Sequence, residues 1–157
     1  NNARCEDGVN FIRVDGFVKN IHIYDAMSDA IDVDFSNLHF NNINIENAGN
    51  DCIDFSAGKY EVFHSNLNKC RDKAISVGEQ TVSFFHNVEI SNSNVGIATK
   101  DSSMATINNA KFKDTALCLS AYNKKQEFWG GKIKVYDYSC SSNTLYQEKN
   151  SIIEIMQ

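Results

Sequence analysis

A repeat of 22 residues is the feature that most constrains what this chain can fold into. Short apolar segments start with a small residue, and each start lies 22 residues after the previous one. The next position is aliphatic in every row, and apolar residues recur two places later, which is the alternation of a β-strand. A fixed period of this length is typical of solenoid proteins. The row starts are Gly8, Ala30, Cys52, Ala74, Gly96 and Cys118.

A second strand follows in each row and carries a column of asparagines. Examples are FVKNIHI from Phe17 and LHFNNINI from Leu38. Asparagine tolerates the left-handed backbone conformation of tight turns, and stacked asparagines can hydrogen-bond to the coils above and below. We therefore expect an asparagine ladder along the stack. The positions assigned to it are Asn20, Asn42, Ser65, Asn87 and Asn109.

Other repeat classes fit these rows less well. Leucine-rich repeats need a register that is absent, and helical repeats need a period of about 3.6 residues. A coil of 22 residues suits three short strands joined by turns, and each coil buries its apolar face only by stacking on neighbours. The sequence predicts an all-β fold, a right-handed parallel β-helix (solenoid) of about six coils of 22 residues. It forms a single domain over residues 1–157, with irregular C-terminal coils from about residue 124.

The ends and the charge of the chain restrict its partners. Residues 1–7 are short for a cap, and an open stack end is a strand-pairing hazard. We therefore expect a packing partner or a further domain at the N-terminal end, within a longer protein. No apolar run is long enough to span a membrane. A net charge of −5, from 15 basic and 20 acidic residues, disfavours nucleic acid as a partner.

The five cysteines do not describe a closed disulfide framework, because their number is odd. Cysteine often fills small positions in protein cores. The sequence therefore predicts buried free thiols, and it leaves the redox compartment open.

Aspartates gather on one face of three successive coils. Adjacent strands lie about 4.8 Å apart. Stacked carboxylates at about that separation repel by roughly 1 kcal/mol in water and by about 3 kcal/mol at an effective dielectric constant of 20. The group consists of Asp7, Asp29, Asp51, Asp32, Asp54 and Asp34.

This repulsion should be offset, either by a bound cation, by raised pKa values, or by Arg13 and Lys73 nearby. Oxygen ligands favour Ca²⁺ over zinc. The alternative is a solvated acidic face, because aspartate is also favoured at turns by local backbone hydrogen bonds. The ligands of the expected calcium site are Asp29, Asp32, Asp51 and Asp54.

The asparagine ladder beside aliphatic columns resembles the pectate-lyase-like right-handed parallel β-helix superfamily. The rows SDAIDVDFS, GNDCIDFS, DKAISVGE and ATKDSS are also similar to uncharacterised bacterial right-handed β-helix proteins. Residues 50–54 (NDCID) resemble the Asp-Asp-Cys segment of polygalacturonases, whose Gly-His-Gly and Arg-Ile-Lys motifs have no counterpart here. The resemblance implies an extracellular or cell-surface protein with a polysaccharide or cell-surface glycan as its partner.

The resemblance also implies a carbohydrate-active domain that acts on or binds an acidic polysaccharide, as a calcium-dependent lyase or epimerase. A lyase neutralises the uronate carboxylate, removes the C5 proton and protonates the leaving oxygen. A glycoside hydrolase would use two carboxylates instead. The candidate catalytic residues are Lys73 or Lys100 as base, Tyr122 or Glu79 as acid, and Asp54 as cation ligand or hydrolytic carboxylate.

A non-catalytic surface or secreted module, for glycan binding or structural spacing, is the alternative function. The expected turns are short and leave little to enclose a substrate. Such a module would stack sugars on exposed aromatic rings, unless these rings pack in the core or a cap. The sequence leaves open whether the chain is an enzyme. The candidate aromatic residues are Tyr24, Tyr122, Trp129 and Tyr136.

Overall fold

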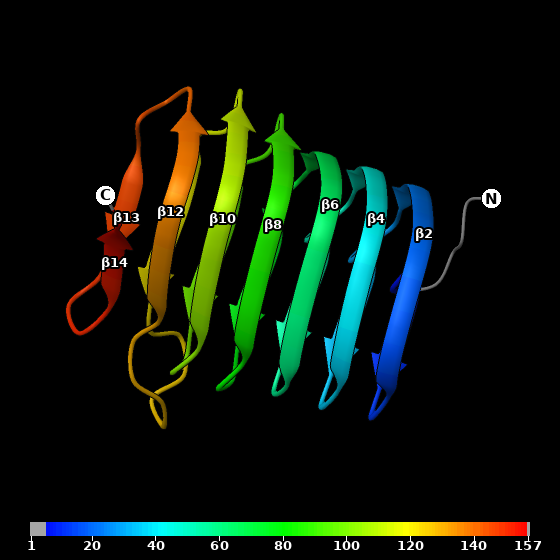
Figure 1. Ribbon diagram of the computed structural model, residues 1–157, viewed down its shortest axis with the longest axis horizontal. Coiled ribbons are helices and arrows are strands. Elements are labelled where there is room, and N and C mark those ends of the chain that lie inside the picture. The colour runs from blue at the N-terminus through cyan, green and yellow to red at the C-terminus, as the bar shows by residue number, and fades with distance from the viewer. Residues whose placement is uncertain (1–5, 157) are drawn as a thin grey trace.

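The computed structural model describes residues 6–156, and this part of the chain is a parallel β-solenoid (Figure 1). Strands form two parallel seven-stranded sheets, so the stack has about seven turns rather than six. Residues stack 22 apart along most of the chain, as Asn42 does on Asn20. The all-β solenoid is therefore confirmed, and its right-handed sense stays a prediction. Within residues 6–156 there is no helix with the length and apolar character needed to cross a membrane.

Sheet A contains the short strand that begins each coil, and sheet B contains the long strand that follows it. Sheet A consists, in spatial order, of β1 (Val9–Ile12), β3 (Ile31–Asp34), β5 (Ile53–Ser56), β7 (Lys73–Gly78), β9 (Val95–Lys100), β11 (Leu117–Tyr122) and β13 (Leu145–Gln147). Sheet B consists of β2 (Asp15–Ala26), β4 (Asn37–Ala48), β6 (Lys59–Cys70), β8 (Val82–Ser91), β10 (Met104–Lys113), β12 (Lys132–Cys140) and β14 (Ile152–Ile155).

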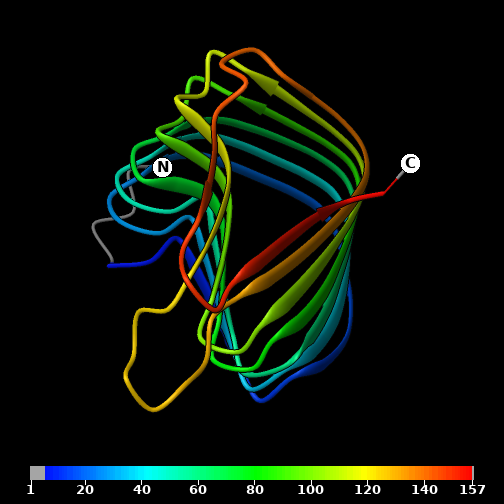
Figure 2. The same ribbon diagram turned by 90° about the vertical axis from the view of Figure 1, so that its left-hand side faces the viewer.

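Each regular coil bends at three positions where the backbone is left-handed. In the coil that begins with β3, these are Phe35, Asn42 and Asn47, with φ of 50°, 62° and 67°. The first lies at the corner after sheet A, the second in the middle of β4, and the third near its end. These bends close each coil around the core, and Figure 2 shows the successive coils superimposed along the stack.

The middle bend carries the expected ladder, with one correction. The Asn42 side chain donates to the Asn20 side chain at 2.7 Å, and Asn109 donates to Asn87 at 2.8 Å. In the third coil the strand register places His64, with φ of 56°, at the ladder position. The assignment of Ser65 was wrong, because Ser65 is 4% exposed and stacks between Ile43 and Val88 in the next column.

The core is built from the predicted apolar columns. Ile31, Ile53 and Ile75 stack in register in sheet A and are fully buried. Five of the six small residues that begin the rows are buried as well, because the chain turns from sheet B into sheet A there, and the first, Gly8, is half-buried. A Cβ atom on Gly96 would lie 2.5 Å from the Phe112 ring. These positions therefore need small residues for packing.

Two disulfides overturn the prediction of free thiols for four cysteines. Cys52 bonds to Cys70, and Cys118 bonds to Cys140. In each pair the start of a sheet A row meets the end of a sheet B strand at one corner, with Cα atoms 5.3 and 6.1 Å apart. These separations lie in the range that a disulfide spans. Cys5 lies outside the described residues.

Candidate functional site

The candidate site is the outer surface of sheet A. Inward side chains of β3 and β5 are buried, so the alternation of a strand turns Asp32 and Asp54 outward. These two residues are paired in register on neighbouring strands. We call this surface the acidic face. Its members are Asp29, Asp32, Asp34, Asp51 and Asp54, with Lys73 and Lys100 beside them.

The aspartates just before the strands form a corner ladder with a structural role. The Asp29 carboxylate accepts hydrogen bonds from the Asp51 backbone N–H at 2.8 Å and from the Asn50 side chain at 2.7 Å. The Asp51 carboxylate accepts one from the Lys73 backbone N–H at 2.9 Å. Each carboxylate therefore satisfies a backbone donor of the next coil, which favours aspartate at this position independently of any ligand.

Lys73 occupies the next position of this ladder, after Asp29 and Asp51, and places a positive charge there. Its ammonium lies 3.3 Å from the Asp51 carboxylate and also bonds to Asp72. Burial raises the pKa of Asp51 to about 6, although the Lys73 charge opposes that shift. Burial lowers the pKa of Lys73, but Asp72 and Asp51 outweigh it, and the net pKa lies above its usual value. Lys73 therefore stays protonated at neutral pH and contributes a positive charge beside Asp51, and its role as a base stays a prediction.

The carboxylates in the middle of the face are less well satisfied. Asp32 accepts a hydrogen bond from the Asn10 side chain at 2.9 Å. Burial, followed by repulsion from Asp34 and Asp54, raises the pKa of Asp32 to about 7. Within the described residues, the buried Oδ1 atom of Asp54 has no hydrogen-bond partner. At neutral pH, this cluster therefore holds a carboxyl group that can either donate or accept a proton.

Lys100 brings a buried positive charge into this cluster. The residue is 6% exposed, and its ammonium donates to the Ser76 hydroxyl and lies 3.8 Å from Asp54 Oδ1. Its side chain crosses β7 above Gly78, where a Cβ atom would lie 3.1 Å from Lys100 Cε. Gly78 therefore leaves the space through which Lys100 reaches from β9 to β5. The structure places both predicted lysines beside aspartates, Lys73 at Asp51 and Lys100 at Asp54.

The two predicted acids have different surroundings. Tyr122 is paired in register with Lys100, and burial raises its pKa although Lys73 opposes the shift. Its phenol therefore keeps its proton at neutral pH. Glu79 lies at the corner after β7 and forms an ion pair with Lys125. Its carboxylate is thus engaged by residues 123–131 rather than by the centre of the face.

The fit of the face to calcium is partial. Within residues 6–156, no three or more His, Cys, Asp or Glu side chains are grouped so that they could hold a metal ion. Asp29 and Asp51 already bond to backbone donors, so Asp32 and Asp54 keep the more available oxygens. A calcium ion here would need water or ligand oxygens to complete its coordination, which usually takes 6–8 oxygens. The calcium site stays a prediction.

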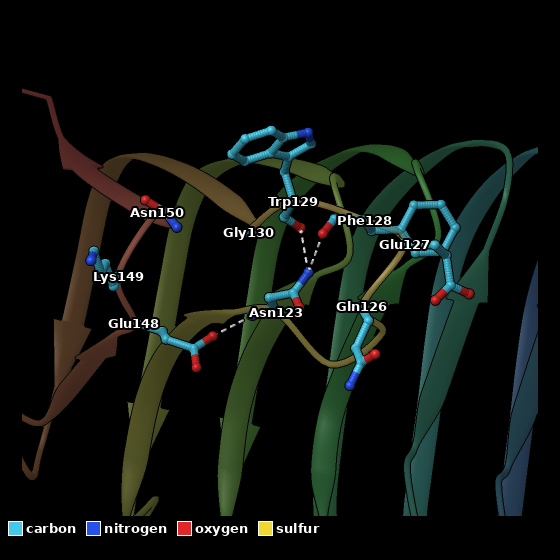
Figure 3. A pocket seen from close by; sticks show the side chains of 9 residues that line it. All are labelled: Asn123, Gln126, Glu127, Phe128, Trp129, Gly130, Glu148, Lys149 and Asn150. Atoms are coloured by element: carbon cyan, nitrogen blue, oxygen red, sulfur yellow. Dashed lines mark hydrogen bonds between the residues drawn. The ribbon is translucent and has the colours of Figure 1, made fainter.

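A second feature is the segment after Asn123, where the sequence indicated an irregular part of the repeat and offered Trp129 as a candidate sugar-stacking ring but did not predict an ordered loop. Residues 123–131 connect β11 to β12 and border a cavity of about 540 Å³ (Figure 3). Trp129 lines this cavity and is strongly exposed. Of the four aromatic candidates, Tyr24, Trp129 and Tyr136 are exposed, whereas Tyr122 is half-buried.

Comparison of the chain with protein-family models, with curated proteins and with solved structures gives no match. The functional assignment therefore depends on the chemistry of these two surfaces.

Proposed function

We propose that this chain is a carbohydrate-active β-helix domain of the pectate-lyase-like type, whose acidic face acts on or binds an acidic polysaccharide. The observation that carries the proposal is the buried Lys100 ammonium, held beside Asp54 in a cluster of repelling carboxylates. Burying a charge and crowding like charges both cost stability. Groups with strongly perturbed pKa values gather at functional sites, and Asp32 is such a group.

In a lyase or epimerase reaction, we assign each of these residues one role. Asp32 and Asp54 would hold a Ca²⁺ ion, and this ion would neutralise the uronate carboxylate of the substrate. Lys100 would act as the base after its ammonium has released a proton to solvent, and its neutral amine would then take the C5 proton. Tyr122, which keeps its own proton at neutral pH, would protonate the leaving oxygen and regain a proton from solvent. Lys73 contributes a fixed positive charge beside Asp51.

An extracellular or cell-surface location accompanies this proposal. Disulfides are typical of proteins in oxidising compartments, and Cys52–Cys70 and Cys118–Cys140 support such a location. This location would also give the acidic face access to a large glycan outside the cell.

A non-catalytic glycan-binding or spacer module is the second candidate, and the short corners favour it. β3 ends at Asp34 and β4 begins at Asn37, so little chain rises beside the centre of the acidic face. Polysaccharide-cleaving sites usually exclude water around the reacting bond. A module that only binds glycan does not require that enclosure.

The experiment is a screen of polygalacturonate, alginate and chondroitin with Ca²⁺ or with EDTA. Binding is measured by affinity electrophoresis, and lyase activity by the ultraviolet absorbance of the unsaturated product. We expect calcium-dependent product with one polymer. Lys100→Met should lower the rate by roughly a hundredfold or more, the usual contribution of a positioned acid or base. Asp54→Asn should weaken the calcium dependence.

The matched control is Lys111→Met, because Lys111 is an exposed lysine that pairs with Glu89 on sheet B. This variant should keep both rate and binding. Polymer binding that depends on Asp54 without any product would select the non-catalytic module. If no acidic polymer bound, with or without calcium, both functions of the acidic face would be refuted.

A further inference from the structure

The segment 123–131 is the part of the solenoid that departs most from the regular corners. Residues 101–103 make the same connection in the previous coil, between β9 and β10. The longer segment projects beside the end of sheet A, as Figure 2 shows for the loop that follows β11. We call it the Trp129 loop. The ion pair between Lys125 and Glu79 ties it to the corner of an earlier coil.

The Trp129 loop is held in one shape by hydrogen bonds at its base. The Trp129 backbone N–H donates to the Ser102 hydroxyl at 2.8 Å, and the Trp129 carbonyl accepts from the Ser102 backbone N–H at 2.7 Å. The buried Asp101 carboxylate accepts from the backbone N–H groups of Lys124 and Lys125, both at 2.8 Å. Asn123 donates from its side chain to the carbonyl of Phe128 at 2.6 Å. The loop is therefore preorganised.

Despite this anchored backbone, the Trp129 side chain is 74% exposed. A large aromatic ring on an ordered backbone exposes apolar area that folding normally buries. Figure 3 shows the indole above Asn123, with Glu148, Lys149 and Asn150 to one side. Glu148 is fixed through a 2.6 Å hydrogen bond from the Asn123 backbone N–H to its carboxylate. The cavity of about 540 Å³ is thus lined by two aromatic residues, Phe128 and Trp129, together with several amide and charged groups.

We propose that the Trp129 loop is a binding site for a neutral sugar unit. The ring offers a flat apolar surface for the C–H face of a sugar, and the amides of Gln126 and Asn150 can donate to and accept from its hydroxyls. The carboxylates of Glu127 and Glu148 outnumber the one lining cation, Lys149, so an anionic sugar is disfavoured. This inference does not rest on the function of the acidic face.

The single tryptophan of the chain makes the test direct, because all tryptophan fluorescence reports on Trp129. The probes are trisaccharides of glucose, mannose, xylose and galactose, titrated into the oxidised protein. At least one should shift the emission saturably to shorter wavelength and protect the ring from iodide quenching. Gln126→Ala keeps the fluorophore and should weaken the affinity several-fold. A panel that changes the emission no more than sorbitol does at equal concentration would overturn the proposal.

Saturation-transfer NMR supplies a readout that does not need tryptophan. Trp129→Ala should weaken binding of the selected trisaccharide by roughly tenfold or more, as expected for an aromatic anchor, and Trp129→Phe by less. The control is Tyr136→Ala, which removes an exposed ring outside the cavity and should leave binding unchanged. Full affinity in Trp129→Ala would refute the site. So would emission that shifts on concentrating the sugar-free protein, because a second copy would then cover the ring.

Discussion

At the scale of single residues, aspartate has two different roles on one face. In the corner ladder, Asp29 and Asp51 accept backbone hydrogen bonds from the next coil, which offsets part of their repulsion. Asp32 and Asp54 point outward in the middle of the strands. Within the described residues, Asp32 accepts a hydrogen bond only from the Asn10 side chain, and Asp54 Oδ1 accepts none. The same residue type is therefore structural at one position and chemically available three positions later.

The raised pKa of Asp32 predicts a pH dependence of stability. Burial and the neighbouring carboxylates raise the pKa to about 7 from an ordinary value of 3.8. Between these values, the folded state binds a proton that the unfolded state has lost. The Asp32 contribution is therefore favourable at low pH, and stability decreases as the pH rises from about 4 to about 7. Asp51, with a pKa of about 6, acts in the same direction.

Asp32→Asn should remove part of this dependence. We expect the variant to melt roughly 2–4 °C above the parent at pH 7.5, the shift that about 1 kcal/mol produces in a domain of this size. Solvent screens part of the repulsion, so a larger gain is not expected. At pH 4 the two proteins should melt alike. Scanning calorimetry at both pH values measures this, and an equal change in melting temperature at both would contradict the assignment.

At the scale of one element, the middle bend of sheet B shows what the sequence could and could not predict. The column of asparagines was visible because four of its five members are asparagine. The third coil was misassigned because His64 occupies the left-handed position, and a histidine there is not distinguishable from an outward strand residue by pattern alone. The small serine beside it looked like the better turn residue, although it is buried in the core.

The ladder makes a prediction for this element. His64→Asn places asparagine where φ is 56°, between Asn42 and Asn87 in the register. Asparagine adopts this conformation at lower cost than histidine, and it can bond along the ladder. We expect a gain of about 1 kcal/mol in the free energy of unfolding. The control is His22→Asn, because His22 is an exposed histidine of β2 without a positive φ. Equal effects of both changes, by denaturant titration, would contradict the ladder assignment.

Much of the fold followed from the sequence because a solenoid repeats its local rules in every coil. The apolar columns and the aspartate columns were predictable, since a fixed period turns sequence spacing into spatial stacking. The disulfides were not, because they join the start of one strand type to the end of another. Cys52 and Cys70 meet only once the coil closes. Trp129 itself was a predicted candidate for sugar stacking, but the ordered conformation of its loop was not predicted, because that order depends on Asp101 and Ser102 of the preceding coil.

At the scale of the whole molecule, stability is a sum of contacts between neighbouring coils. A coil in the middle of the stack packs against two neighbours, and a terminal coil packs against one. Within residues 6–156, the two disulfides differ in burial. Cys52–Cys70 closes an interior coil, and both residues are buried. Cys118–Cys140 lies at the last coils, and Cys140 is only partly buried.

We therefore expect the two disulfides to differ in accessibility in the native protein. With a mild reductant and iodoacetamide, Cys118 and Cys140 should be alkylated first, because Cys140 is only partly buried whereas Cys52 and Cys70 are both buried. Cys52 and Cys70 should react only on the timescale of unfolding. Peptide mass spectrometry measures both rates, and the same reaction in denaturant, where the rates should converge, is the control. Earlier modification of Cys52 and Cys70 would show that burial in the native structure does not set the order in which the two disulfides react.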